Sequence, residues 1–252
     1  MDRFPKLEII SIFGVGCDAV DLAAARARGV VVTNTPDVLT EDTADYAMAL
    51  LLALARRIAE GDRFVRAGRW LKGPLPNSSR VHGRKLGIVG LGRIGAAAAA
   101  RARAFSMDVH WHGPRPKPDV PYVYHNDLVE LAETVDFLLL TCPGGPETHA
   151  IINGEVLTKL GPNGFLINIA RGSVVDELAL IHALSTNAIA GAALDVFPDE
   201  PRVNPALTMF ENVILEPHIA STTVETRRAI GDLMVANLIA HFEQRPHLSR
   251  VV

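Results

Sequence analysis

The sequence has few cysteines, no excess of basic charge and no long apolar run, and each shortage excludes a class of protein. Two cysteines in 252 residues are too few for a disulfide-rich secreted domain. A net charge of −3 provides no basic surface for nucleic acid. The longest apolar run, 47–55, is much shorter than the roughly 20 residues that cross a bilayer. We therefore expect a cytoplasmic protein with reduced thiols and with no nucleic-acid or membrane partner.

No group of cysteine and histidine residues has the spacing of a metal site, so we predict no bound metal. Hydrophobic residues make up 48% of the chain, which is enough for one large domain or two smaller ones. Short apolar segments alternate with helical patterns, and this alternation is typical of a parallel sheet covered on both faces. We expect strands at 8–13, 30–32, 85–89, 108–112, 136–141, 164–169, 188–194 and 212–215, and helices at 21–28, 41–67, 93–104, 127–133, 155–160, 176–185 and 222–242.

The stretch LGIVGLGRIG, residues 86–95, contains glycines at the spacing G-x-G-x-x-G. Such a triplet is weak evidence alone, but here a predicted strand precedes it and a predicted helix follows. In a dinucleotide site, Gly90 would permit the tight turn, Gly92 would let the backbone approach a pyrophosphate, and Gly95 would let helix and strand pack. The segment therefore predicts a Rossmann-type, doubly wound α/β domain.

The end of the next strand indicates which dinucleotide is preferred. NAD sites place a carboxylate there to bind the ribose 2′-hydroxyl, but residues 111–118, WHGPRPKP, contain none. His112 and Gly113 leave room for an additional group, and the cations Arg115 and Lys117 would attract a 2′-phosphate. The two cations could instead be ordinary solvated loop charges. We favour NADP(H) over NAD(H), which remains possible.

Three further stretches each follow a predicted strand, on the side where open α/β sheets bind ligands. They place Arg171, Asp195 with Glu200, and His218 in these loops. An arginine fork binds a carboxylate, a histidine transfers a proton near neutral pH, and a carboxylate can fix the histidine tautomer. Such a group suits the reduction of a carbonyl beside a dinucleotide. His110 and His112 belong to the expected strand at 108–112. The other histidines, His125 among them, are expected at the surface or in turns.

These motifs resemble the D-isomer-specific 2-hydroxyacid dehydrogenase family over nearly the whole chain. The resemblance includes GVGCDAVD, GIVGLGRIG, INIARGSVVDE, GAALDVFPDEP and EPHIAS, in the order of the family. It implies that Arg171 binds the substrate carboxylate and carbonyl oxygen, that His218 is the acid/base, and that Glu200 orients His218. Asp195 would hold the nicotinamide carboxamide. WHGPRPKPDVPYVYH is most similar to NADPH-preferring glyoxylate and hydroxypyruvate reductases.

The resemblance also places backbone and side chains around the two ligands. Val15 and Gly16 would offer main-chain N–H groups to the substrate carboxylate. The other residues expected at the cofactor are Arg93, Ile94, Cys142, Pro143, Thr148 and Ile169. Cys17 and Cys142 have no base beside them in the sequence pattern, so we expect both thiols to be passive.

Two domains follow from the resemblance. Residues 39–222 would form the dinucleotide-binding domain, with a dimerisation helix and arm at about 41–82. Residues 1–38 and 223–252 would form part of a flavodoxin-like substrate-binding lobe, whose first strand–helix units are absent. We expect a homodimer acting on a small 2-oxo or 2-hydroxy acid.

Three alternatives remain open at this point. The chain could be an NADH-linked dehydrogenase for another 2-hydroxy acid. It could be a dinucleotide-sensing binding protein without catalysis, or an inactive shortened form of a family member.

Overall fold

The computed structural model describes residues 1 and 3–252, which divide into two units. One unit contains residues 1–42 and 221–252, and the other contains residues 43–220. In the described residues, no helix is both long enough and apolar enough to cross a bilayer.

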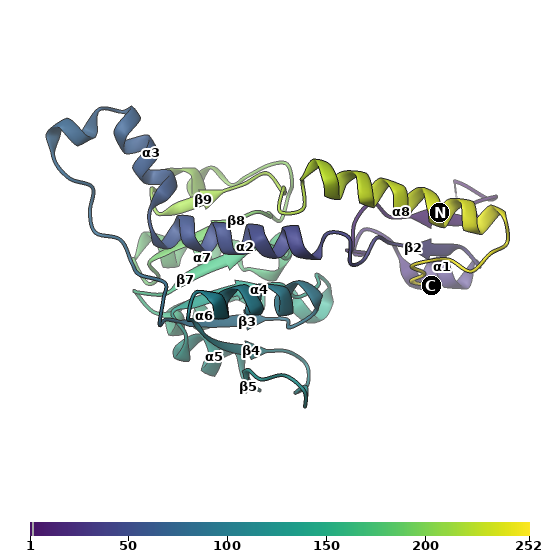
Figure 1. The fold of residues 1–252 in the computed structure, drawn as a ribbon, viewed down its shortest axis with the longest axis horizontal. Coiled ribbons are helices and arrows are strands. Elements are labelled where there is room, and N and C mark those ends of the chain that lie inside the picture. The colour runs from purple at the N-terminus through teal and green to yellow at the C-terminus, as the bar shows by residue number, and fades with distance from the viewer. Residues whose placement is uncertain (2) are drawn as a thin grey trace. The chain divides into compact units, whose positions relative to one another are not determined.

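The larger unit contains a seven-stranded sheet in which every neighbouring pair is parallel (Figure 1). The strand order is β5-β4-β3-β6-β7-β8-β9. This order confirms the predicted doubly wound sheet. The strands are β3 (Lys85–Val89), β4 (Asp108–His112), β5 (Val123–His125), β6 (Phe137–Leu140), β7 (Phe165–Asn168), β8 (Gly191–Leu194) and β9 (Val213–Leu215).

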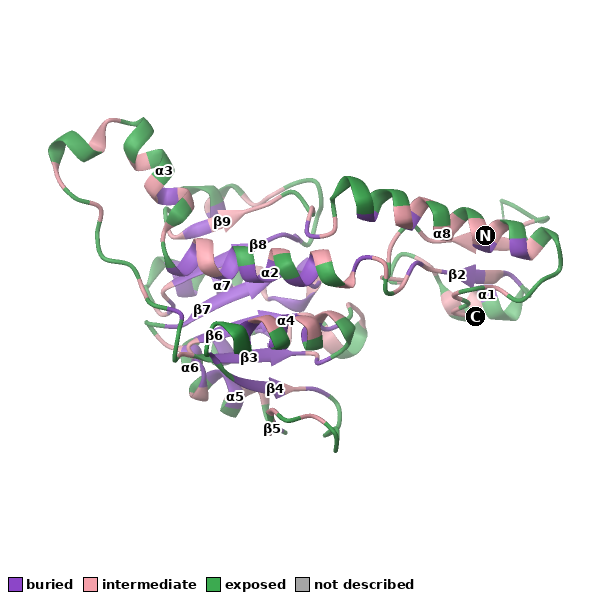
Figure 2. Ribbon diagram, viewed as in Figure 1, coloured by how far each residue is buried: buried purple, intermediate pink, exposed green. Residues whose placement is uncertain are grey.

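Helices cover both faces of this sheet, and the strands between them are buried (Figure 2). Strand β6 illustrates why the strands are apolar throughout. Phe137 and Leu139 join the core on the side of α2 and α4, whereas Leu138 and Leu140 join the core on the other side. The helices of this unit include α2 (Thr40–Ala55), α3 (Ile58–Arg66), α4 (Arg93–Ala104), α5 (Leu128–Thr134), α6 (Gly154–Leu160) and α7 (Glu177–Ser185).

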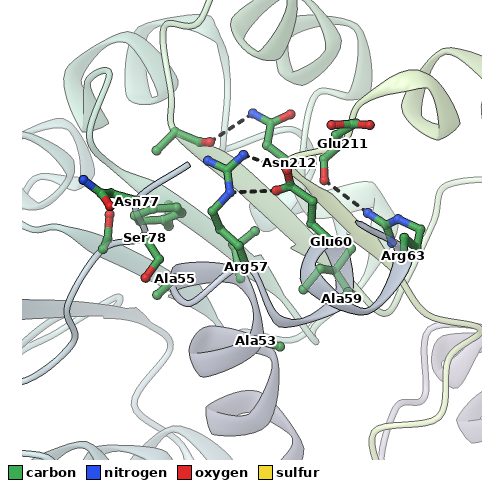
Figure 3. A pocket seen from close by; sticks show the side chains of 15 residues that line it. Ala53, Ala55, Arg57, Ala59, Glu60, Arg63, Asn77, Ser78, Glu211 and Asn212 are labelled. Carbon is green, nitrogen blue, oxygen red and sulfur yellow. Dashed lines mark hydrogen bonds and ion pairs between the residues drawn. The ribbon is translucent and has the colours of Figure 1, made fainter. Parts of the chain in front are cut away.

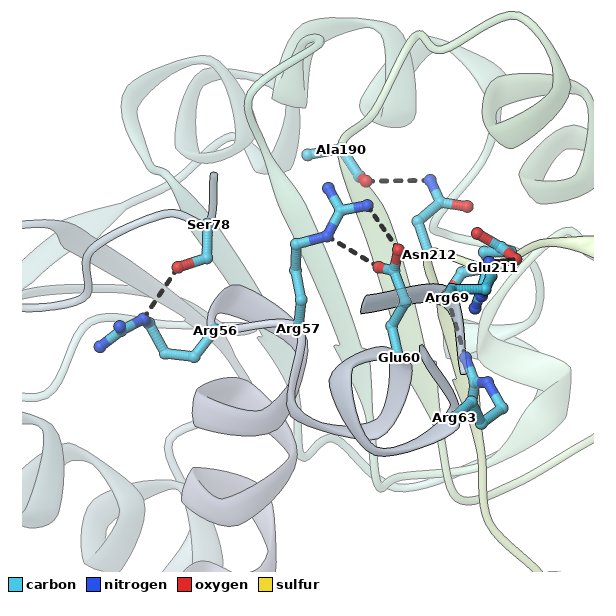
Figure 4. A network of polar contacts seen from close by, with 9 residues as sticks. All are labelled: Arg56, Arg57, Glu60, Arg63, Arg69, Ser78, Ala190, Glu211 and Asn212. Atoms are coloured by element: carbon cyan, nitrogen blue, oxygen red, sulfur yellow. Dashed lines mark hydrogen bonds and ion pairs between the residues drawn. The ribbon is translucent and has the colours of Figure 1, made fainter. Parts of the chain in front are cut away.

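The prediction of a single helix over 41–67 is wrong. Helix α2 ends at Ala55, and α3 begins at Ile58. Between them, Arg57 adopts φ 55°, in the left-handed region, which interrupts the helical hydrogen bonds. The Arg57 guanidinium donates two hydrogen bonds to the buried Glu60 carboxylate, at 2.7 and 2.8 Å (Figure 4). This bidentate pair stabilises the break, and no pattern of apolar residues announces it.

Strand β5 was not predicted either. It has three residues and lies at the edge of the sheet, where it pairs with β4. So short a segment gives no detectable alternation of apolar and polar residues. The expectation that His125 lies in a turn or at the surface is wrong, because it ends β5 and is 7% exposed.

The smaller unit contains a two-stranded parallel sheet, formed by β1 (Ile9–Ser11) and β2 (Val31–Thr33). Helix α1 (Leu22–Ala27) connects the two strands, and α8 (Val224–Phe242) contacts β1. Asp21 caps α1 by accepting the Ala24 N–H. The chain end also pairs here, since the Val251 N–H donates to the Val32 carbonyl at 2.7 Å.

Candidate active site

The glycine loop follows β3, at the point where the strand order of the sheet reverses. At two of its glycines, neighbouring atoms leave no space for a Cβ. A Cβ at Gly90, which has φ +96°, would lie 2.6 Å from the Cα of Cys142. A Cβ at Gly95 would lie 2.5 Å from the Gly90 carbonyl oxygen. These positions require glycine because β6 and α4 approach the loop so closely.

Gly92 differs from both, because a Cβ there would meet no atom within 4 Å. Gly92 is also the N-cap residue of α4 and has no side chain to bond the first amides of the helix. Arg93 and Ile94 begin that helix. A helix N-terminus favours phosphate, and open space at the middle glycine is what a pyrophosphate needs. The residues of the loop therefore fit a dinucleotide.

The loop after β4 extends back to the glycine loop. Lys117 Nζ donates to the Leu91 carbonyl at 2.5 Å and lies 5.9 Å from the centre of the Trp111 ring. The His112 carbonyl accepts the Gly90 N–H at 2.9 Å. Gly113 is buried against Trp111, whereas Arg115 is exposed. The structure thus brings Lys117 and His112 to the predicted cofactor loop.

Glu200 and His218 form a pair. His218 Nδ1 lies 2.8 Å from Glu200 Oε2, and the other carboxylate oxygen accepts the Phe197 N–H at 2.9 Å. A carboxylate only accepts hydrogen bonds, so His218 Nδ1 carries the proton in this contact. The remaining ring nitrogen, Nε2, is then the atom that can gain or release a proton. About half of the His218 side chain is exposed, so the imidazole is accessible.

Asp195 positions the segment after His218. It is 1% exposed, and its two oxygens accept the N–H groups of Ile219 and Ala220, at 2.8 and 2.9 Å. Burial raises the pKa of the Asp195 carboxyl, and the two amide donors oppose that rise. His218 has φ 55°, and these two contacts hold the left-handed turn in place. The predicted contact of Asp195 with nicotinamide remains a prediction.

Arg171 follows β7, beside the loops that carry Glu200 and His218. The three loops leave β7, β8 and β9, which are neighbouring parallel strands, at the same edge of the sheet. Asn168, almost completely buried, donates from its amide to the Arg171 carbonyl at 3.0 Å. The Arg171 side chain packs over Gly144, where a Cβ would lie 2.9 Å from its Cγ. The guanidinium is only partly buried and can meet a ligand.

A hollow of about 230 Å³ borders the Glu200–His218 pair. Its other walls are mostly apolar. The apolar walls are formed by Phe197, Pro201, Val203, Leu215 and Pro217.

The remaining predicted residues lie near the ends of their strands. Pro143 and Thr148 flank a short turn, in which the Thr148 hydroxyl donates to the Pro143 carbonyl at 2.7 Å. Ile169 belongs to the core on the α2 and α4 side. Val15 and Gly16 belong to the smaller unit, where the Val15 carbonyl accepts from the Asn34 amide.

Both thiols were expected to be passive. Cys142 is buried, and this burial raises its pKa to about 11, so the protonated, unreactive form predominates near neutral pH. Among the described residues, no three His, Cys, Asp or Glu side chains are placed to hold a metal ion.

A second hollow, of about 130 Å³, lies at the opposite edge of the sheet (Figure 3). It is bounded by the end of α2, the start of α3 and the residues that precede β8 and β9. Two of its arginines already have partners, as Figure 4 shows for Arg57 with Glu60 and for Arg63 with the Glu211 backbone carbonyl. None of the predicted site residues lines it.

Three positioning residues were not found from the sequence. Thr141 donates from its hydroxyl to the Gly90 carbonyl at 2.6 Å. Its position at the end of an apolar strand was the sequence signal that could have indicated this role. Gly172 abuts the Glu200 loop, since a Cβ there would lie 2.0 Å from the Phe197 carbonyl carbon. Burial of Tyr46, together with the influence of the Glu216 carboxylate, raises the pKa of the Tyr46 hydroxyl. Nothing in the sequence links Tyr46 to this site, because Tyr46 lies in α2, far along the chain from Glu200 and His218.

Comparison with known proteins gives consistent results. Residues 48–220 match the model of the D-isomer specific 2-hydroxyacid dehydrogenase, NAD binding domain. The chain is 50% identical to hydroxyphenylpyruvate reductase of Plectranthus scutellarioides, over all of this chain and 80% of that protein. It is also 50% identical to glyoxylate/hydroxypyruvate reductase A of Arabidopsis thaliana, over 98% of this chain and 79% of that protein.

A solved structure shows the same fold. It is the NADPH-dependent glyoxylate/hydroxypyruvate reductase of Sinorhizobium meliloti in complex with NADP and malonate. The TM-score is 0.96 at 49% identity, covering all of this chain and 80% of that chain. Sequence and fold therefore confirm the resemblance drawn from the motifs: the chain belongs to the D-isomer specific 2-hydroxyacid dehydrogenase family.

Proposed function

We propose that the chain reduces a small 2-oxo acid, such as glyoxylate or hydroxypyruvate, to the 2-hydroxy acid with NADPH. The observation that carries this proposal is the 2.8 Å contact between His218 Nδ1 and Glu200, at the edge of the sheet where the glycine loop is open at Gly92. The names of the relatives support the substrate class, and the NADP complex from Sinorhizobium meliloti supports the cofactor.

Each proposed catalytic side chain has a separate task. When bound, NADPH supplies a hydride to the keto carbon of the substrate. Arg171 binds the substrate carboxylate and orients the carbonyl, since its planar fork matches two oxygens. His218 donates the proton from Nε2 to the carbonyl oxygen, so that the ketone becomes an alcohol. Glu200 holds the Nδ1–H and stabilises the imidazolium that precedes proton transfer.

Specificity for NADPH is assigned to the loop after β4. Arg115 and Lys117 would provide positive charge for the 2′-phosphate, and Gly113 leaves space beside His112. Lys117 already reaches the glycine loop through the Leu91 carbonyl. The backbone of Gly92, Arg93 and Ile94 would surround the pyrophosphate. Cys142, Pro143, Thr148 and Ile169 would line the cofactor, and Asp195 would accept from the carboxamide.

We also propose the domain roles and the assembly. Residues 39–222 would bind the dinucleotide, and residues 1–38 and 223–252 would form part of the substrate lobe, with Val15 and Gly16 at the substrate. The cytoplasm is proposed because the two cysteines form no disulfide. A homodimer is proposed from the exposed apolar side chains of the arm. Trp70 is 67% exposed and Leu71 is 94% exposed, which favours contact with a second copy over solvent.

The test is steady-state oxidation of NADPH and of NADH with glyoxylate, hydroxypyruvate and hydroxyphenylpyruvate. We expect turnover, with higher kcat/KM for NADPH than for NADH at each substrate. Binding of NADPH without turnover of any 2-oxo acid would contradict the enzymatic function and favour a dinucleotide sensor. Equal kcat/KM with both cofactors would contradict the role given to Arg115 and Lys117.

A further inference from the structure

Two histidines that the reaction does not use bond each other beneath the loop after β4. His110 Nδ1 and His125 Nε2 are 2.9 Å apart, and each ring is 8% exposed. His110 Nε2 lies 3.1 Å from Asp108 Oδ2, and His125 Nδ1 lies 3.5 Å from Glu130 Oε1. The four side chains form a chain with a carboxylate at each end and two imidazoles between them.

The number of protons in this chain follows from its contacts. Two of the contacts, Asp108 to His110 and His110 to His125, are hydrogen bonds, and each needs one proton between its two atoms. The two N–H protons of two neutral imidazoles satisfy both. One additional proton, on His125 Nδ1, would face the Glu130 carboxylate 3.5 Å away. A second additional proton would place two N–H groups against each other at 2.9 Å and force the rings apart.

Other charged groups lie on the neighbouring elements, and Lys85 on β3 is in register with Asp108. On β3, the residue in register with His110 is Gly87, which has no side chain. On β4, the His112 ring donates through Nδ1 to the His125 carbonyl, at 3.0 Å. At the start of α5, the Asp127 carboxylate accepts the N–H groups of the first turn of that helix.

The pair fastens the edge strand β5 to β4, and β5 in turn holds parts of the proposed NADPH site. The His125 carbonyl fixes the His112 ring, and the Tyr124 hydroxyl donates to the Gly113 carbonyl at 3.0 Å. His112 and Gly113 are the residues at which the loop toward the 2′-phosphate begins. Displacement of His125 would therefore move both.

We propose that His110 and His125 are positioning residues of the cofactor site, and that the proton they share makes the binding of NADPH sensitive to acid. This inference rests on the proposed function, because it assigns the loop after β4 to the 2′-phosphate. As pH falls through the range in which imidazoles gain charge, the pair accepts the second additional proton. Strand β5 then separates from β4, and NADPH binds less tightly.

The test compares wild type with His125→Gln, whose amide can still bond His110 but does not titrate. The dissociation constant of NADPH is measured by fluorescence between about pH 8 and about pH 5.5, the interval that brackets imidazole titration. Wild type should weaken at least about fivefold more than His125→Gln across this range. NADPH and the rest of the protein are the same in both measurements, so the difference isolates the pair. His182→Gln, at an exposed histidine of α7, is the matched control and should follow wild type.

Equal pH dependence in wild type and His125→Gln would overturn the proposal. His125→Leu, which cannot bond His110, should bind NADPH weakly at every pH if it folds. Nitrogen NMR of the labelled imidazoles, without cofactor, should show coupling across the N–H···N contact near neutral pH and its loss in acid. Absence of this coupling refutes the shared proton, whereas absence of NADPH binding at every pH, with the coupling present, refutes the proposed function.

Discussion

The open position at Gly92 gives the most direct test of the glycine loop. Gly92 has φ −80°, which alanine adopts without strain, and a Cβ there meets nothing within 4 Å. Gly92→Ala should therefore change the free energy of unfolding by no more than about 1 kcal/mol. The added methyl group, however, would occupy the space through which a pyrophosphate approaches the backbone. We expect the dissociation constant of NADPH to rise at least about tenfold, equivalent to about 1.4 kcal/mol.

Gly90→Ala is the matched comparison, because the same methyl group meets a different environment. It would lie 2.6 Å from the Cys142 Cα at φ +96°. Left-handed backbone strain and overpacking together give a loss of about 2 to 5 kcal/mol in the free energy of unfolding. Urea unfolding and NADPH fluorescence titration on both variants separate the two effects. Wild-type affinity for NADPH in Gly92→Ala would refute the assignment of the opening to the pyrophosphate.

Three further predictions concern the catalytic residues and the buried thiol. His218→Ala should lower kcat by about 10² to 10⁴ while the dissociation constant of NADPH stays unchanged, and near-normal kcat would exclude His218 as the proton donor. Arg171→Lys should lower kcat/KM nearly as much as Arg171→Ala, because one ammonium cannot replace the fork, and a Lys variant close to wild type would contradict two-point binding. The folded pKa of Cys142, about 11, lies above its ordinary 9.0, so its contribution to stability is complete below about pH 9 and is lost as pH rises toward 11. Between these limits wild type should lose about 2 to 3 kcal/mol more than Cys142→Ala in chemical unfolding, and equal losses would refute the burial argument.

The sequence predicted those features that repeat along the chain or that depend on local spacing. The apolar strands and the triplet of Gly90, Gly92 and Gly95 are local patterns, and the sheet is parallel as predicted. The break at Arg57 was missed because it depends on an ion pair with Glu60, which forms only when the backbone turns. The burial of His125 was missed because β5 is three residues long and its partner, His110, belongs to another strand.

The same distinction applies within the candidate site. The residue types at 171, 200 and 218 follow from motifs that each lie within one loop. Two further contacts that hold these loops join one loop to another, so no single segment contains both partners. Asp195 bonds the amides after His218, and Gly172 abuts Phe197 in the loop that carries Glu200. Such contacts need the order β7-β8-β9, which a pattern along one chain does not contain.

These anchors also determine how variants of the site should be interpreted. In the Arg171 loop, the backbone carbonyl of Arg171 accepts from the Asn168 side-chain amide. In the His218 loop, the backbone N–H of Ile219 donates to Asp195. In the Glu200 loop, the backbone N–H of Phe197 donates to Glu200. Replacing Arg171 or His218 removes neither partner of its anchor, so the loop should keep its conformation while its chemistry is lost. Glu200 is different, because its side chain accepts the Phe197 N–H and the His218 proton through its two oxygens. A change at Glu200 therefore alters structure and proton transfer together, and Arg171 and His218 are the positions at which chemistry can be measured alone.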